Sequence, residues 1–255
     1  MSLTAPDALA VFAAAFGAGA INSIAGAGSL ITFPTLLATG YGSVIANVSN
    51  NIGLVPGSFA GAWGYRSELA GQWHRVRALV PWAALGGATG GVLLLALPSG
   101  SFRAVVPGLV LLAGLLVLAQ PYLRALVARR TSDRDPAIHV GLFTYLGVFA
   151  SAMYGGYFGA AQGVLLLGIL GIGLPVTLYQ ANALKNVLTL TINAVAAVYF
   201  MFAADVAWTA VGIIAAGSIL GGVVGSRYGR RVPAGPLRLM IAAIGIGVAI
   251  VLLVT

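Results

Sequence analysis

Long apolar stretches alternate with short polar segments along the whole chain. About eight of them have the length of roughly 20 residues that an α-helix needs to cross a bilayer; they are 8–24, 44–65, 78–97, 104–123, 140–158, 177–204, 208–224 and 237–254. Two further stretches, 30–39 and 164–174, are too short to span comfortably. The pattern predicts an all-α polytopic membrane protein with about eight full-length transmembrane helices and two short or broken ones.

The first half of the sequence matches the second half at an offset of 135 positions (182 − 47 = 135). The informative matches are Asn47 with Asn182, Asn51 with Asn186, and Trp73 with Trp208. Glycine and alanine matches arise by chance in such a composition, whereas these do not. We therefore predict two homologous repeats, 8–123 and 138–255, joined by a basic linker, 124–137.

Basic residues concentrate in three loops, 66–77, 124–134 and 227–238, while the loops around 99–103 and 203–208 hold one arginine and none. Cytoplasmic loops are enriched in Lys and Arg, so an even number of crossings should separate the three basic loops. If 164–174 counts as a crossing, each half has five crossings and the second half runs opposite to the first. The sequence thus predicts inverted-topology repeats, as in many secondary transporters, with both termini outside the cytoplasm.

Composition excludes a soluble protein, since the 255 residues are 60% hydrophobic and only 7% charged, with a mean hydropathy of +1.00. The net charge of +8 comes mainly from loop arginines, so we expect no nucleic-acid partner. Without cysteine there is no disulfide, thiolate metal site or cysteine nucleophile. The N-terminal stretch lacks the basic region of a signal peptide and is expected to remain as the first helix.

Polar residues within the apolar stretches follow one helical face in each half. The second half has Asn182, Lys185, Asn186, Thr189 and Asn193, and the first half has Asn47, Asn50, Asn51 and Ser58. Polar side chains are costly inside a membrane and mark functional sites more often than packing. We expect the two faces to meet near the interface of the repeats.

Lys185 lies about two and a half turns inside its apolar stretch. All five acidic residues lie at the ends of stretches or in loops, so none is embedded beside it. A buried ammonium surrounded by asparagine amides suits an anionic substrate. The alternative is that Lys185 extends along its aliphatic stem to the nearer interface.

Glycine-rich turns precede both short stretches, with Gly26, Gly28 and Ser29 in the first half and Gln162 and Gly163 in the second. Free backbone N–H groups at the start of a broken helix can hold an anion. The alternative is close helix packing through small residues.

Other chemistries find little support. His74 and His139 share no metal-ligand spacing, and Ser29 and Ser49 have no embedded histidine or acid to activate them. We therefore expect neither an enzyme nor a cofactor.

Several motifs resemble one known family. GAGS followed by LITFPTLL and the ANVSNN helix start in the first half, with GGYFGAAQGVLLLGILGIGLP and QANALKN in the second, are similar to the TauE/SafE family of permeases, also called the sulfite exporter or toluene-sulfonate uptake family. The resemblance implies a two-repeat permease of the bacterial inner membrane for sulfite or sulfur-containing organic anions, outward in many members. It also implies a substrate path lined by Gly26, Gly28, Asn47, Asn51, Gln162, Gly163, Asn182, Lys185 and Asn186. To these the polar pattern adds Ser29, Asn50 and Asn193.

The sequence leaves three functions open: an alternating-access exporter of sulfonates or sulfite, an anion channel or uniporter for small carboxylates or inorganic anions, and a membrane enzyme or scaffold. The embedded groups are poor in acids and bases, which disfavours the enzyme. Without an embedded carboxylate we expect no carboxylate-based proton coupling, and electrogenic uniport is the simplest mechanism. Export of an anion gains about 2.3 kcal/mol per charge per 100 mV. The expected partners are a small anion and the lipid bilayer. The sequence leaves open whether the protein forms a homodimer.

Overall fold

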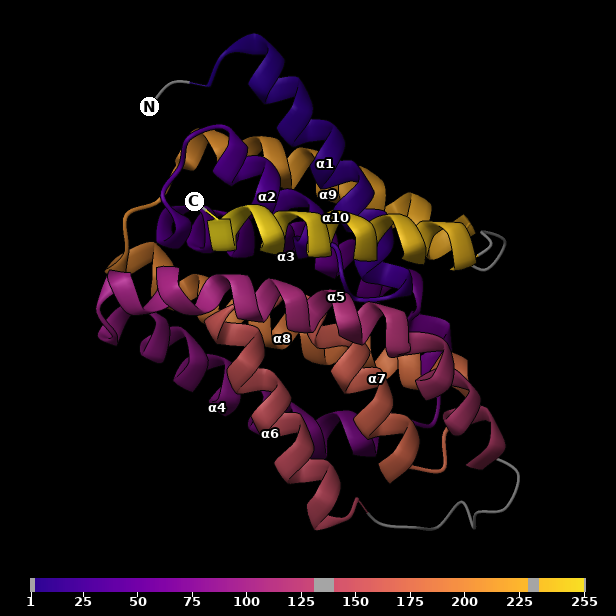
Figure 1. Cartoon of the computed structure of the whole chain (residues 1–255). Helices are drawn as coiled ribbons and strands as arrows, with labels where there is room; N and C mark the ends of the chain where they lie inside the picture. Colours follow the sequence, from indigo (N-terminus) through magenta and orange to yellow (C-terminus); the bar gives the residue numbers. More distant parts are fainter. Residues whose placement is uncertain (1–2, 131–139, 229–233, 255) are drawn as a thin grey trace.

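The computed structural model describes residues 3–130, 140–228 and 234–254, which fold into helices without a strand (Figure 1). The elements are α1 (Ala5–Ile24), α2 (Ser29–Ala38), α3 (Ser43–Gly64), the 3-10 helix η1 (Arg66–Leu69), α4 (Trp73–Ala96), α5 (Ser99–Arg130), α6 (Leu142–Tyr157), α7 (Gln162–Gly173), α8 (Leu178–Ala203), α9 (Trp208–Tyr228) and α10 (Ala234–Val254).

Each apolar stretch of the sequence corresponds to one helix, so the all-α prediction is confirmed for the described residues. Among the described residues, five helices are long and apolar enough to cross a membrane: α1, α4, α5, α8 and α9. Helices α2 and α7 have 10 and 12 residues, or about 15 and 18 Å, well below the ~30 Å of a hydrocarbon core. These properties are those of a multi-pass membrane protein.

Helix boundaries differ from the predicted ones in the basic segments. Helix η1 was not predicted, and α4 begins at Trp73 rather than at 78. Helix α5 continues to Arg130, so the first part of the predicted linker 124–137 is helical, and its remainder lies outside the described residues. Leucine, alanine and arginine favour helix in water as well as in lipid. Apolarity therefore marks the part of a helix inside the bilayer, not its full length.

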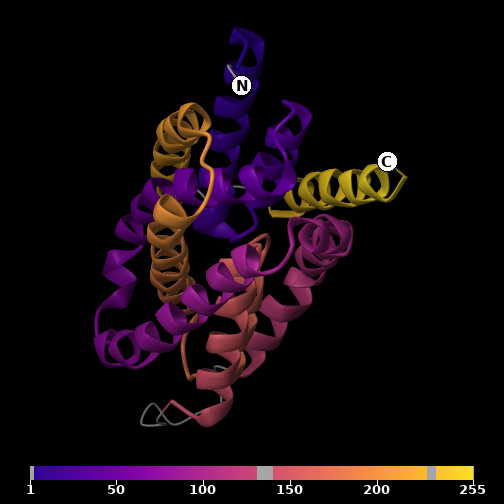
Figure 2. The same cartoon turned by 90° about the vertical axis from the view of Figure 1, so that its left-hand side faces the viewer.

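The first helix of each half ends in the interior of the molecule. Figure 1 shows α1 entering from the top and α6 from the bottom, and Figure 2 again places these two helices on opposite sides of the centre. Both end just before a glycine with positive φ, Gly26 at 76° and Gly159 at 80°. This conformation is accessible to glycine without steric cost, and it turns the chain into the short helices α2 and α7.

The two halves are packed crosswise. Helix α1 packs on α9 and α6 packs on α4, so each first helix lies against a helix of the other half. Glycines make the contact close: a side chain at Gly90 of α4 would strike the Met153 carbonyl, and one at Gly221 of α9 would strike the Phe16 carbonyl. Helices α3 and α8 pack on each other, as do α5 and α10, which run side by side across Figure 1.

Corresponding helices of the two halves start at a constant residue offset, except near the first helix of each half. The starts of α3 and α8, α4 and α9, and α5 and α10 all differ by 135 (178 − 43, 208 − 73, 234 − 99). The ends of α1 and α6, and the starts of α2 and α7, differ by 133 (157 − 24, 162 − 29). Since α7 is two residues longer than α2, the offset of 135 found in the sequence does not extend to the first helices.

Two faces of the molecule are distinguished by charge. On the basic face the end of α3 meets the end of α9, because a side chain at Gly64 would strike Ser226. Among the described residues it exposes Arg66, Arg77 and Arg227, whereas the Arg75 side chain is buried. On the opposite face the α2–α3 turn lies beside the α8–α9 loop, and both line one pocket.

Candidate functional site

Lys185 joins α8 to the end of α1. Its side chain is 0% exposed, and Nζ donates to the backbone carbonyl of Asn22 at 3.0 Å and, more distantly, to that of Ser23 at 3.5 Å. The last carbonyls of a helix lack partners within the helix and carry the negative end of its dipole. Lys185 therefore caps α1 from the other half of the chain. This placement does not fit the snorkelling alternative, in which the ammonium reaches water.

Two asparagines of α8 converge on the same helix end. Nδ2 of Asn182 and Nδ2 of Asn186 donate to the Ser23 carbonyl at 3.1 and 3.2 Å. We call Asn182, Lys185 and Asn186 the α1 cap. A carbonyl oxygen has two lone pairs, so three donors share an acceptor that satisfies two. One donor of the α1 cap can therefore turn to a ligand while the end of α1 stays bonded.

A reciprocal contact caps α6, with the donor on the first half and the capped helix in the second. Nδ2 of Asn47, on α3, donates to the carbonyl of Tyr157, the last residue of α6, at 2.9 Å. Asn47 is the counterpart of Asn182 at the offset of 135, so each half caps the broken helix of the other. The counterpart of Lys185 is Asn50 (185 − 135 = 50), which is buried. The positive charge thus exists at only one of the two related positions.

The glycine turns pack backbone against backbone next to the α1 cap. The N–H of Gly163 donates to the carbonyl of Gly26 at 3.2 Å. A Cβ at Gly163 would lie 2.5 Å from Cα of Gly26 and 3.2 Å from Cδ of Lys185. The N–H of Gly28 is bonded to Oδ1 of Asn22 at 2.7 Å. Two of the N–H groups expected to hold an anion are thus occupied within the chain, which fits the close-packing interpretation of these glycines.

Gln162 extends the polar region along α8. At the first residue of α7, its Nε2 donates to Oδ1 of Asn193 at 2.9 Å, and both side chains are buried. Its other amide atom, Oε1, lies against Gly155 without a hydrogen-bond partner. Ser29 occupies the related first position of α2 and is half-buried.

Several buried acceptors in this region have no hydrogen-bond partner within the protein. They are Oδ1 of Asn50, Asn51 and Asn182, Oε1 of Gln162 and Oγ1 of Thr189. An unsatisfied buried polar atom costs about 1–3 kcal/mol, so native proteins keep few of them without a reason. Four of the five belong to residues predicted for the substrate path. Their amide oxygens can accept hydrogen bonds from water or from a polar ligand.

Asn22 is a site residue that the sequence reasoning missed. It accepts from Gly28 through its side chain and from Lys185 through its carbonyl, and so links the glycine turn to the α1 cap. Its position in the last turn of an apolar stretch, just before GAGS, was the available signal. Neither histidine belongs to this group of residues as described. His74 lies at the start of α4, and His139 lies outside the described residues.

The chain is similar to known proteins over most of its length. The family model for the sulfite exporter TauE/SafE matches residues 11–252. A Haemophilus influenzae protein named "Probable membrane transporter protein" is 29% identical over 226 residues, which cover 87% of this chain and 85% of the relative. "Probable membrane transporter protein YfcA" of Escherichia coli K12 is 26% identical over 221 residues, covering 85% and 78%. This multi-pass membrane chain belongs to the TauE/SafE sulfite exporter family.

Proposed function

We propose that the protein exports small sulfur-containing anions, sulfonates or sulfite, across the bacterial inner membrane by alternating access. The observation that carries the proposal is the complete burial of the Lys185 ammonium at the end of α1, among amide groups of α8. The family is named for sulfite export, which supports a sulfur-containing anion as substrate, and the relatives are named as membrane transporters.

The energetics of Lys185 favour an anionic ligand. A charge within a transmembrane bundle is costly and is retained mainly where it serves a pathway or a ligand. Two of its partners, the Asn22 and Ser23 carbonyls, are neutral groups. A sulfonate or sulfite oxygen would bring a full negative charge to the ammonium, whereas a carbonyl oxygen brings only a partial one. The amides of Asn182 and Asn186 supply further directed donors beside it.

The crosswise packing supports alternating access through two inverted repeats. Helices α1 and α6, related by the internal repeat, occupy equivalent places against α9 and α4, and each is capped from the other half. A pair of structurally similar halves can exchange their conformations, which opens a central site first to one face and then to the other.

Flux measurements test the proposal. Purified protein in liposomes should carry sulfite and 2-hydroxyethanesulfonate with saturable kinetics, and a neutral analogue of similar size, such as ethylene glycol, should not compete. Flux that rises linearly to the highest concentration would indicate a channel. Saturable flux of acetate or chloride in preference to both sulfur anions would contradict the assigned substrate class.

A further inference from the structure

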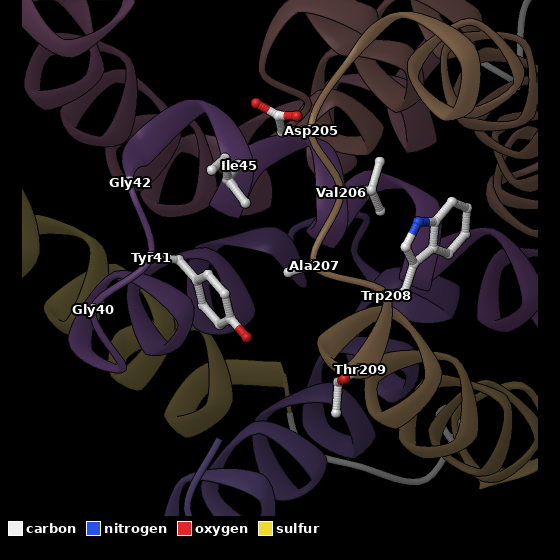
Figure 3. A pocket seen from close by; sticks show the side chains of 9 residues that line it. All are labelled: Gly40, Tyr41, Gly42, Ile45, Asp205, Val206, Ala207, Trp208 and Thr209. Carbon is white, nitrogen blue, oxygen red and sulfur yellow. The ribbon is translucent and has the colours of Figure 1, made fainter. Parts of the chain in front are cut away.

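The pocket on the opposite face has a closed counterpart on the basic face. The pocket has a volume of about 400 Å³ and lies between the α2–α3 turn and the α8–α9 loop. Its lining residues are Gly40, Tyr41, Gly42, Ile45, Asp205, Val206, Ala207, Trp208 and Thr209. Figure 3 shows the Tyr41 ring and the Trp208 indole on either side of Ala207. We call this pocket the vestibule.

The internal repeat relates the vestibule to a specific place on the basic face. At the offset of 135, Tyr41 of the vestibule corresponds to Val176 in the α7–α8 loop, and Ala204, which precedes the lining residue Asp205, corresponds to Leu69 on η1. Val176 is only 1% exposed and Leu69 only 4%, and both belong to one apolar cluster with Tyr65 and Leu174. We call Tyr65, Leu69, Leu174 and Val176 the apolar gate. Related pairs of connections are thus apart at one face and packed together at the other.

The vestibule leads to a helix that carries predicted site residues. The N–H of Ala207, in its lining, donates to Oγ of Ser49 at 2.9 Å. Ser49 directly precedes Asn50 and Asn51 on α3, whose amide oxygens are buried and unpartnered. The lining of the vestibule is therefore bonded to α3, the helix that also carries Asn50 and Asn51. The side chains of the apolar gate pack in one apolar cluster, and an anion that crosses such a contact must lose its hydration.

From this asymmetry we infer that the vestibule is one entrance of the transport path, and that the apolar gate is the closed entrance at the other end. The inference rests on the proposed function. The structure is accordingly the state open to the face opposite the basic loops. In the alternate state the α2–α3 turn and the α8–α9 loop pack together, and the apolar gate separates.

The α2–α3 turn has the backbone freedom that this closure requires. Gly40 adopts a φ of 90°, and a Cβ at Gly42 would meet no heavy atom within 4 Å. Tyr41 lies between these two glycines, and its counterpart Val176 is already packed in the apolar gate. Closure of the vestibule therefore means that Tyr41 becomes as buried as Val176.

The chain contains no cysteine, so single-cysteine variants can be labelled without a modified background. We would measure the rate at which a charged maleimide modifies Ile45→Cys in the vestibule and Val176→Cys in the apolar gate, in detergent, where both faces are accessible. Without substrate, Ile45→Cys should react at least tenfold faster. Saturating 2-hydroxyethanesulfonate should raise the rate at Val176→Cys at least threefold and lower it at Ile45→Cys. Ala207→Cys and Leu69→Cys provide a second pair if a variant does not fold.

Modification of Ile45→Cys with a bulky maleimide should also abolish flux in liposomes. Equal rates at the two cysteines without substrate, rates that do not respond to a sulfonate that is transported, or full flux after modification would each overturn the inference. If no anion is transported, the proposed function fails, whereas the rate difference without substrate still tests which entrance is open.

Discussion

The Lys185 ammonium of α8 donates to the Asn22 carbonyl of α1 at 3.0 Å, although the two residues belong to different halves of the chain. The contact places the buried positive charge of Lys185 at the end of α1. It also links substrate binding to the packing of the halves, because an anion that attracts Lys185 competes with the carbonyls that hold α1.

The two asparagines of the α1 cap should be partly redundant for stability. Asn182→Ala and Asn186→Ala each leave another donor to the Ser23 carbonyl, so each should lower the free energy of unfolding by less than about 1 kcal/mol. The double variant removes both amide donors and should cost more than the sum. Thermal unfolding in detergent provides a double-mutant cycle. Strictly additive effects would mean that the two bonds are independent.

No second side-chain donor should compensate for the loss of Asn47 at the end of α6. Asn47→Ala removes the Nδ2 donor to the Tyr157 carbonyl and should destabilise the protein by about 1–2 kcal/mol. Asn47→Asp should be worse, since a carboxylate would face a carbonyl oxygen. Thr89→Ala is a control, because the Thr89 hydroxyl bonds only within its own helix, to Leu85. If Asn47→Asp is as stable as the wild type, the assigned contact is wrong.

Gly163 should tolerate no side chain. In Gly163→Ala the new methyl group would lie 2.5 Å from Cα of Gly26. Overpacking of this kind costs about 1–3 kcal/mol and displaces backbone, so we expect a lower melting temperature and loss of transport. Gly212→Ala is the matched control in α9, where a Cβ meets no heavy atom within 4 Å. It should be neutral or stabilising, since alanine favours helix over glycine by about 1 kcal/mol.

Much of the helical framework could be predicted from the sequence, because apolar stretches and the spacing of asparagines reflect short-range geometry. The polar face of α8 was recognised, and Asn182, Lys185 and Asn186 do converge on one place. Their partner was not foreseen. Periodicity shows which residues share a face, but the helix end that meets that face is decided by tertiary packing. The N–H groups of Gly28 and Gly163 were expected to bind an anion, and they bond within the chain for the same reason.

Transport should follow the membrane potential rather than a pH gradient. The described acids lie away from the helix centres: Asp7 in the first turn of α1, Glu68 on η1, and Asp205 in the α8–α9 loop. Asp133 and Asp135 lie outside the described residues. A negative interior should drive anion export by about 2.3 kcal/mol per charge per 100 mV. With the potential clamped at zero, an imposed pH gradient should produce no accumulation; uphill accumulation would assign a proton-carrying group to the interior.

Equilibrium binding of 2-hydroxyethanesulfonate to the purified protein, measured by calorimetry, tests the role of Lys185 most directly. We predict that Lys185→Ala weakens binding at least tenfold, that Lys185→Arg retains part of the affinity through its charge, and that Thr191→Ala binds as the wild type does, since the Thr191 hydroxyl bonds only to Val187 of its own helix. Unchanged affinity in a folded Lys185→Ala variant would contradict the proposal that this buried ammonium binds the transported anion.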